Sequence, residues 1–260
     1  MSDFKNQKIW ITGASSGIGA ALAFEFNKLG ARVLISARRP EALQTVKNAC
    51  KYPENVEVLV IDLEQIQMAS EVVNRAFQLM GDIDVLVANA GIGQSANALD
   101  TKEEVEMRIF NINYHGHLAI SKWVIKRMLE KGRGQVVAIG SIAGKFGQKK
   151  LAAYSASKAA LIVYYESLAQ ELSNTPIKIQ VVSPGFIQTN VTLNSLDANG
   201  NRLNKNSKAQ ENGMPTSVFA QKFIKAIKKK RFHQYVGGKE LLAVPLHAVF
   251  PALFYKLLSK

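Results

Sequence analysis

The chain has 260 residues, 47% of them hydrophobic and 20% charged, a composition typical of a globular protein with a substantial core. Its single cysteine, Cys50, excludes an internal disulfide framework and a cysteine-rich metal site. The formal net charge of +13 suits a polyanionic ligand, an anionic membrane surface or nucleic acid, and charge alone does not choose among them.

Short apolar runs rich in valine and isoleucine alternate with helix-length segments along the chain. We expect strands at 8–12, 32–36, 56–61, 84–88, 135–140 and 177–183, and helices at 18–29, 40–50, 65–80, 101–130 and 151–173. The strands are apolar almost throughout, as in sheets that are covered on both faces. Because such alternation gives right-handed crossovers, the sequence predicts a single-domain α/β protein with a doubly wound parallel sheet, a three-layer αβα Rossmann fold.

The stretch "TGASSGIG" (12–19) follows the first expected strand and opens the first expected helix. Gly13, Gly17 and Gly19 permit a tight turn and a close approach of the backbone to a ligand. The first helical turn would then present N–H groups and a positive dipole end to a pyrophosphate. The alternative is a tight strand–helix turn that binds nothing.

The charged residues that follow the second expected strand indicate whether the chain would bind NAD or NADP. NAD-binding folds of this kind carry an acidic residue near this point, whereas arginine accommodates the 2′-phosphate of NADP. Here Ala37 is followed by Arg38 and Arg39, and arginine donates two hydrogen bonds to a phosphate readily. The sequence therefore favours NADP over NAD, and the alternative is a pair of solvated arginines.

Tyr154 and Lys158, in "YSASK" (154–158), stand one helical turn apart on the same face. Alone, the pair is as well explained by a polar surface helix. The other motifs that accompany it are "NAG" (89–91), "NIN" ending at Asn113, Ser141, and "PG" (184–185) followed by Thr189. Together with the glycine loop, this ordered set resembles the classical short-chain dehydrogenase/reductase family in its NADP-preferring form, over about residues 8–190.

The resemblance implies four catalytic residues. Tyr154 would be the general acid in carbonyl reduction and the base in alcohol oxidation, and Ser141 would polarise the substrate oxygen. Asn113 would hold a water in a proton relay. A free tyrosine has a pKa of about 10, and a cation about 4 Å away at an effective dielectric near 20 contributes about 4 kcal/mol, or about three pKa units. We therefore expect Lys158 to lower the pKa of Tyr154.

The same resemblance implies an NADP(H) site. Asn89 to Gly91 would pack against the adenine ribose, and Asp62 would hydrogen-bond the adenine amino group unless it only caps a strand end. Lys158 would hold the nicotinamide ribose, and the segment from Pro184 would fix the nicotinamide so that hydride moves at its B face. The expected cofactor-binding set is Gly13, Ser15, Ser16, Gly17, Ile18, Gly19, Arg38, Arg39, Asp62, Leu63, Asn89, Ala90, Gly91, Tyr154, Lys158, Pro184, Gly185, Ile187 and Thr189.

We expect no metal site. His115 and His117 have no nearby cysteine or carboxylate cluster, and we interpret them as packing or surface residues of a helix.

The chain divides into a dinucleotide-binding and catalytic core (1–190), a polar substrate loop or lid (191–214) and a C-terminal extension (215–260). The extension contains a basic amphipathic helix candidate, "KFIKAIKKKR" (222–231), and an apolar segment without formal charge (241–255). It lies either on an anionic membrane surface or packed on the core or a subunit interface. No segment reads as a signal peptide or a membrane span, so we expect a cytoplasmic protein, with peripheral membrane association left open.

The sequence therefore predicts an NADP(H)-dependent oxidoreductase that interconverts a carbonyl and a secondary alcohol, as a homodimer or homotetramer. We expect the substrate side around 143–148, Gly93, Phe186 and 190–213. The candidate substrates are a 3-oxoacyl thioester, a steroid or sterol ketone, a retinoid or other long-chain aldehyde, and a quinone, and the apolar C-terminus favours a lipophilic one. One alternative is a non-catalytic NADP-binding scaffold or sensor. Nucleic acid is not an expected partner, because the sequence carries no recognised binding motif or aromatic platform.

Overall fold

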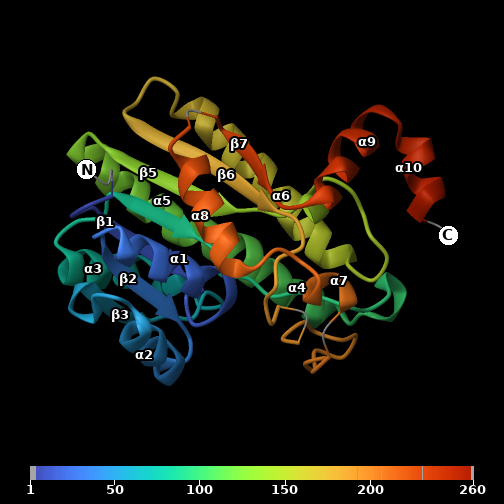
Figure 1. Ribbon diagram of the computed structural model, residues 1–260, viewed down its shortest axis with the longest axis horizontal. Helices are drawn as coiled ribbons and strands as arrows, with labels where there is room; N and C mark the ends of the chain where they lie inside the picture. Colours follow the sequence, from blue (N-terminus) through green and yellow to red (C-terminus); the bar gives the residue numbers. More distant parts are fainter. Residues whose placement is uncertain (1–3, 192, 206, 230, 259–260) are drawn as a thin grey trace.

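A seven-stranded, fully parallel sheet forms the centre of the protein (Figure 1). The computed structural model describes residues 4–191, 193–205, 207–229 and 231–258. The strands are β1 (Lys8–Thr12), β2 (Arg32–Ala37), β3 (Val56–Val60), β4 (Val85–Ala88), β5 (Gly134–Ile139), β6 (Ile177–Pro184) and β7 (His233–Val236). They lie in the order β3-β2-β1-β4-β5-β6-β7. The chain therefore adds β2 and β3 on one side of β1 and then β4 to β7 on its other side, so the strand order reverses between β1 and β4. The predicted doubly wound fold and its first six strands are confirmed.

Helices cover both faces of the sheet. They are α1 (Gly17–Lys28), α2 (Pro40–Ala49), α3 (Ala69–Met80), α4 (Glu103–Phe110), α5 (Gly116–Lys131), α6 (Ala152–Glu171), α7 (Lys208–Glu211), α8 (Thr216–Ile227), α9 (Ala243–Val249) and α10 (Pro251–Leu258). One apolar cluster joins α1, α2 and α8 to one face, and a second joins α3, α5 and α6 to the other. The three-layer arrangement is therefore confirmed.

Strand β1 shows why the strands are apolar at successive positions and do not alternate apolar with polar residues. Ile9 and Ile11 point into one apolar cluster, and Trp10 between them points into the other. All three side chains are fully buried. The indole N–H of Trp10 donates a hydrogen bond of 2.8 Å to Ser36 Oγ on β2, so its one polar atom is satisfied inside the core.

The helix expected at 101–130 is interrupted. A π-helical turn at Asn111–His115 separates α4 from α5. Such turns are short insertions into an α-helix and occur frequently at functional sites. This one contains Asn113, one of the four residues expected to take part in catalysis.

The basic helix expected at 222–231 does not lie free for a membrane. The helix runs from Thr216 to Ile227, and its apolar face is buried against α1, where Phe223 packs on Phe26 with ring centroids 6.4 Å apart. Lys222 and Lys225 occupy the exposed side. The chain then adds β7 beside β6. The apolar face of this helix therefore packs on the core, as the second alternative expected, and β7 is part of the sheet. Membrane contact of the C-terminal extension stays a prediction.

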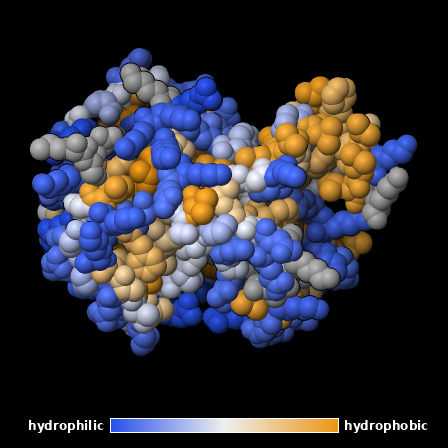
Figure 2. All heavy atoms as spheres, in the orientation of Figure 1, coloured by the Kyte–Doolittle hydropathy of each residue, from blue (hydrophilic) through white to orange (hydrophobic). Residues whose placement is uncertain are grey.

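Among the described residues beyond β7, the two short helices at the end of the chain stand out from the body of the protein (Figure 1). Helices α9 and α10 form a hairpin that projects to one side, and its outer surface is apolar (Figures 1 and 2). The hairpin is attached through Phe254, whose ring lies 4.7 Å from that of Phe146. No helix among the described residues has both the length and the apolar character needed to cross a bilayer.

Candidate active site

A pocket of about 1060 Å³ opens at the carboxyl ends of the parallel strands. Ligands bind at this edge in doubly wound sheets, where the strand order reverses. The pocket is lined by every residue expected to bind the cofactor or act in catalysis except Gly19 and Asn113. Of the expected substrate segment 143–148, only Ala143 and Gln148 line it. Several residues of the segment 189–210 also line it, which places the expected substrate loop at the pocket. Its movement as a lid stays a prediction.

The glycine loop is packed too tightly for side chains. A Cβ on Gly13 would lie 2.5 Å from Ala90 Cα, and one on Gly19 would lie 2.4 Å from the Gly13 carbonyl oxygen. Asn89 fixes the loop from the neighbouring strand, because its Nδ2 donates to Thr12 O at 2.9 Å and to Gly13 O at 3.2 Å. The backbone can therefore approach a ligand closely, as a dinucleotide site requires.

The start of α1 fits a phosphate. Ser16 occupies the N-cap but makes no side-chain capping hydrogen bond. Helix N-termini carry unpaired N–H groups and a positive dipole end, which together bind anions. These features, with the glycine loop beside them, match what the pyrophosphate of a dinucleotide needs.

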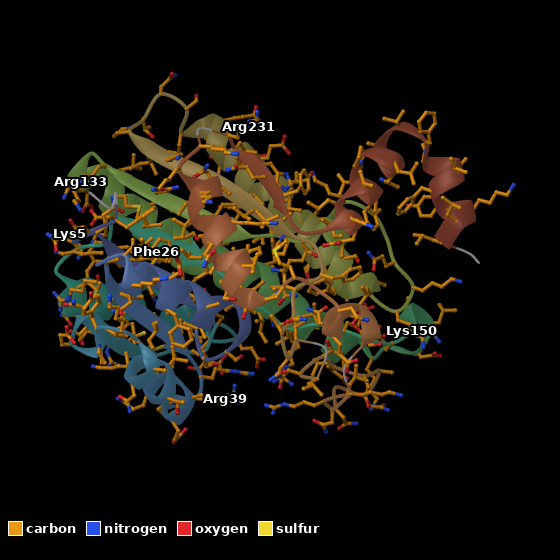
Figure 3. The ribbon with its side chains drawn as sticks, in the orientation of Figure 1. Lys5, Phe26, Arg39, Arg133, Lys150 and Arg231 are labelled. Carbon is orange, nitrogen blue, oxygen red and sulfur yellow. The ribbon has the colours of Figure 1, made fainter. Side chains whose placement is uncertain are left out.

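The two arginines after β2 differ in their surroundings. Arg38 lies 3.8 Å from Glu64 Oε1, an oxygen that also accepts a 2.7 Å hydrogen bond from Arg108 Nε. Within the described part of the chain, Arg39 has no ion pair, and Figure 3 shows it beside α2 at the surface. A 2′-phosphate bound here would therefore meet Arg39, which has no ion pair with a described residue, and Arg38, which shares the Glu64 carboxylate with Arg108.

Asp62 lines the pocket at the end of β3. Its Oδ1 accepts the backbone N–H of Glu64 at 3.0 Å, so the strand-end cap that we weighed against adenine binding is present. The other oxygen has room to act on a ligand, and the adenine role stays a prediction.

Lys158 is almost completely buried, with 3% of its surface exposed. Its ammonium donates a 2.8 Å hydrogen bond to the Ile139 carbonyl oxygen at the end of β5. Asn113 is fully buried too, and its amide makes two hydrogen bonds with the backbone of Ile92, at 2.8 and 3.0 Å. Both side chains converge on Gly91, where an added Cβ would lie 3.2 Å from Asn113 Oδ1 and 3.7 Å from Lys158 Nζ.

The pKa values in this cluster differ from the expected pattern. Burial raises the pKa of Tyr154, and a hydrogen bond with the Ser141 hydroxyl acts in the opposite direction. Burial also lowers the pKa of Lys158 to about 8. The pKa of Tyr154 is therefore raised and not lowered as expected, because the desolvation of the phenol is the largest effect on it. As a result, Tyr154 is a neutral phenol near neutral pH, the form that can donate a proton.

Gln94 is a site residue that the sequence did not reveal. Its side chain is buried, and its Oε1 accepts the backbone N–H groups of Ala153 and Tyr154 at 2.9 and 3.2 Å. Its Nε2 donates to Thr101 Oγ1 at 3.1 Å. Leu151, at the N-cap of α6, cannot cap the helix with its own side chain, so Gln94 does so from outside. This contact holds the helical turn that carries Tyr154.

His117 belongs to the core. It is 1% exposed, and its Nε2 lies 2.5 Å from the Ala90 carbonyl oxygen. Burial, with a smaller effect from Lys158, lowers its pKa to about 3, so the ring is neutral and donates this hydrogen bond. It thereby supports the turn at Asn89–Gly91. The described residues contain no group of three His, Cys, Asp or Glu side chains placed to hold a metal ion.

Comparisons with known proteins agree on one family. The family model described as "short chain dehydrogenase" matches residues 7–200. The "Dehydrogenase/reductase SDR family protein 7-like" of Drosophila melanogaster is 33% identical over 269 residues, covering 99% of this chain and 82% of that protein. The crystal structure of a short chain dehydrogenase/reductase from Burkholderia phymatum in complex with NAD superposes with a TM-score of 0.87 at 21% identity, covering 97% of this chain and 96% of that one. The NADPH complex of an actinorhodin polyketide ketoreductase variant superposes with a TM-score of 0.68 at 31% identity, over 73% of this chain and 74% of that one.

The external cap on α6 has a measurable effect. Replacing Gln94 with alanine leaves the first N–H groups of α6 without their acceptor, and loss of a helix cap costs about 1 kcal/mol. We expect urea denaturation of Gln94→Ala to give a free energy of unfolding lower by about 1–2 kcal/mol, since the capped groups are buried. Gln170→Ala, on the exposed side of the same helix, should be unchanged. Equal stability of the two variants would contradict the capping role.

Proposed function

The chain belongs to the short-chain dehydrogenase family, and on that premise we propose that it is an NADP(H)-dependent oxidoreductase that interconverts a carbonyl and a secondary alcohol. One observation carries the proposal. Ser141, Tyr154 and the buried Lys158 line the same pocket as the glycine loop, and the Ser141 side chain acts on the phenol of Tyr154 by lowering its pKa. A non-catalytic scaffold would have no use for this arrangement.

The proposed reaction uses the two hydroxyls as a pair. A bound nicotinamide dinucleotide supplies the hydride. Ser141 donates a hydrogen bond to the substrate oxygen and so stabilises the charge that develops on it. Tyr154, held as the neutral phenol, gives its proton to that oxygen.

Lys158 and Asn113 act behind Tyr154. With its pKa near 8, Lys158 exists in both protonation states close to neutral pH, so it can stabilise a tyrosinate and help return its proton. Asn113 fixes Ile92 and the turn before it through its two backbone hydrogen bonds. A water held there would complete the relay to solvent. In alcohol oxidation the same proton path runs in reverse.

The surroundings of the pocket support NADP(H) and a lipophilic carbonyl. Arg39 is available for a 2′-phosphate, and no acidic side chain stands at the end of β2 to bind a ribose 2′-hydroxyl. On the substrate side, the pocket is lined by apolar side chains such as Ile92, Leu151 and Leu196. These favour a long-chain, 3-oxoacyl or steroid-like carbonyl over a small polar one.

The assay for this function follows NADPH oxidation with a panel of these carbonyls. We expect turnover of at least one class, and a loss of about 10²-fold or more in Tyr154→Phe, because general acid catalysis contributes that much. Tyr164→Phe, on the same helix but outside the pocket, should retain activity. Equal turnover by wild type and Tyr154→Phe would remove the catalytic assignment.

The same assay tests cofactor choice. NADPH should give a lower KM than NADH, and Arg39→Ala should raise the KM for NADPH about tenfold while leaving that for NADH unchanged, because only NADPH carries the 2′-phosphate. A preference for NADH in the wild type would contradict the NADP assignment.

We also propose that the protein is a homo-oligomer that associates through α5 and α6. Trp123 and Val163 are exposed on these helices, at 42% and 60%. Ala152 and Ala156 on the same exposed side of α6 would let a second helix approach closely. Light scattering that gives the mass of one chain at every concentration would contradict this.

The α9–α10 hairpin offers a different surface, which we assign to an anionic membrane. Its exposed side chains include Leu242 (69%), Val249 (64%), Phe250 (58%) and Leu257 (55%). Residues 241–258 contain no aspartate or glutamate, and the whole chain carries +13, so electrostatics favour an anionic lipid surface.

This attachment is tested by flotation with vesicles that contain phosphatidylserine. We expect the wild type to float with the vesicles and Phe250→Ser/Leu257→Ser to stay in solution, with more binding to anionic than to neutral vesicles. Leu99→Ser, which removes an exposed apolar side chain outside the hairpin, the pocket and the proposed oligomer interface, is the matched control. Loss of oligomers rather than of vesicle binding in the hairpin variant would assign this surface to a second copy of the chain.

A further inference from the structure

The end of the pocket that lies away from the glycine loop is strongly basic. Lys149, Lys150 and Arg202 line it, and Asp62, the one carboxylate among the described lining residues, belongs to the nucleotide end. Figure 3 shows Lys150 at the right of the view and Arg39 beside α2, so these residues mark separate parts of the protein. The basic group at the substrate end is therefore distinct from the arginines proposed to bind the cofactor.

These three cations are exposed at the rim of the pocket and have no ion pair with a described residue. At the nucleotide end, Glu64 lies within 4 Å of both Arg38 and Arg108, at 3.8 and 2.7 Å. By contrast, no described carboxylate forms an ion pair with Lys149, Lys150 or Arg202. Asp197, in the same loop as Arg202, accepts hydrogen bonds from the backbone of Asn199 and Asn201 instead.

The loops that carry the cations are fastened to one another. The Lys150 carbonyl accepts a hydrogen bond from Ala96 N at 3.0 Å, and the adjacent Ser95 N donates to Leu196 O at 2.9 Å. Leu196 in turn forms an antiparallel bridge with Arg202. Lys150 and Arg202 are thus held by neighbouring points of the same small backbone network.

The backbone at Lys150 is unusual for a lysine. Its φ of +67° lies in the left-handed region, which glycine and asparagine adopt more readily. Outliers of this kind persist where the surroundings impose them and cluster at ligand sites. Here the surroundings are the hydrogen bond from Ala96 and the start of α6, which carries Tyr154 in its first turn.

The pocket lining also contains the apolar side chains of Ile92, Leu151 and Leu196, and Leu151 stands between Lys150 and Tyr154 in the chain. We propose that the substrate carries a negatively charged group, a phosphate or a carboxylate, which Lys149, Lys150 and Arg202 bind, and that an apolar chain joins this group to the reacting carbonyl. The inference rests on the proposed function for the carbonyl end. The anionic end follows from charge and geometry alone, because unpaired cations in a pocket attract and orient an anion.

The test is binding, which does not depend on turnover. Titration calorimetry on the NADP⁺-loaded protein would compare three matched compounds: a long-chain keto phosphate, the keto acid of the same length and the uncharged keto alcohol. We expect at least one anionic compound to bind about tenfold or more tightly than the keto alcohol, as one or more charge-assisted hydrogen bonds would give. The keto phosphate and keto acid arms identify which anion is preferred. Equal affinity for all three compounds would overturn the proposal.

Variants assign the effect to the basic group. Lys150→Asn suits the left-handed backbone and, combined with Arg202→Gln, removes two charges from the pocket. This double variant should bind the anionic compound about as weakly as the alcohol, with the affinity for the alcohol unchanged. Lys222→Gln, exposed on α8, controls for net charge and should bind like the wild type. An anion preference that survives in the double variant would also overturn the proposal. Failure of the redox function is a separate result, because it would appear as an absence of NADPH oxidation and not as a change in these affinities.

Discussion

The site depends on one buried cation. An ammonium removed from water is costly unless polar groups replace the lost hydration, and Lys158 is 3% exposed. The carbonyl of Ile139 supplies one hydrogen bond, because β5 ends where α6 passes over it. Burial brings the pKa of Lys158 down to about 8, within reach of physiological pH. A group that is otherwise a fixed charge thus becomes one that can exchange a proton.

The groups around Lys158 are arranged to be neutral. His117 has a pKa of about 3 and donates to Ala90, while Tyr154 is kept as the phenol by burial. Asn113 reaches the same place from the π-helical turn, which gives its amide access to the backbone of Ile92. His117 and Asn113 also hold backbone that lines the pocket, at Ala90 and Ile92. The turn at Asn89–Gly91 and the helix α6 are therefore joined through these side chains, since Asn113 also donates to Ser157 on α6.

The fold was predictable because its first six strands are rich in apolar residues, are largely buried except in the edge strand β3, and are separated by clear helices. The strand β7 was not, because "HQYV" is four residues long and its burial comes from β6 and α8, which a local pattern does not reveal. The amphipathic pattern of α8 was read correctly as a helix, but a pattern does not say that its apolar face meets Phe26. The site residues gathered as expected, since motifs at strand ends meet at one edge. Gln94 was not predicted because its hydrogen-bond partners lie 59 and 60 positions further along the chain. The direction of the Tyr154 pKa shift was predicted wrongly, because sequence spacing identifies a neighbouring charge but does not give the degree of burial.

The most direct test of this account is the pH dependence of carbonyl reduction measured in a single turnover of the NADPH-loaded protein. Lys158 is charged below its pKa and neutral above it, and only the charged form stabilises the tyrosinate that remains after proton donation. The rate should therefore fall as the pH rises through about 8, and Lys158→Met should be slow throughout without this transition. A rate that passes through this pH without change in the wild type would contradict the central role of the buried lysine.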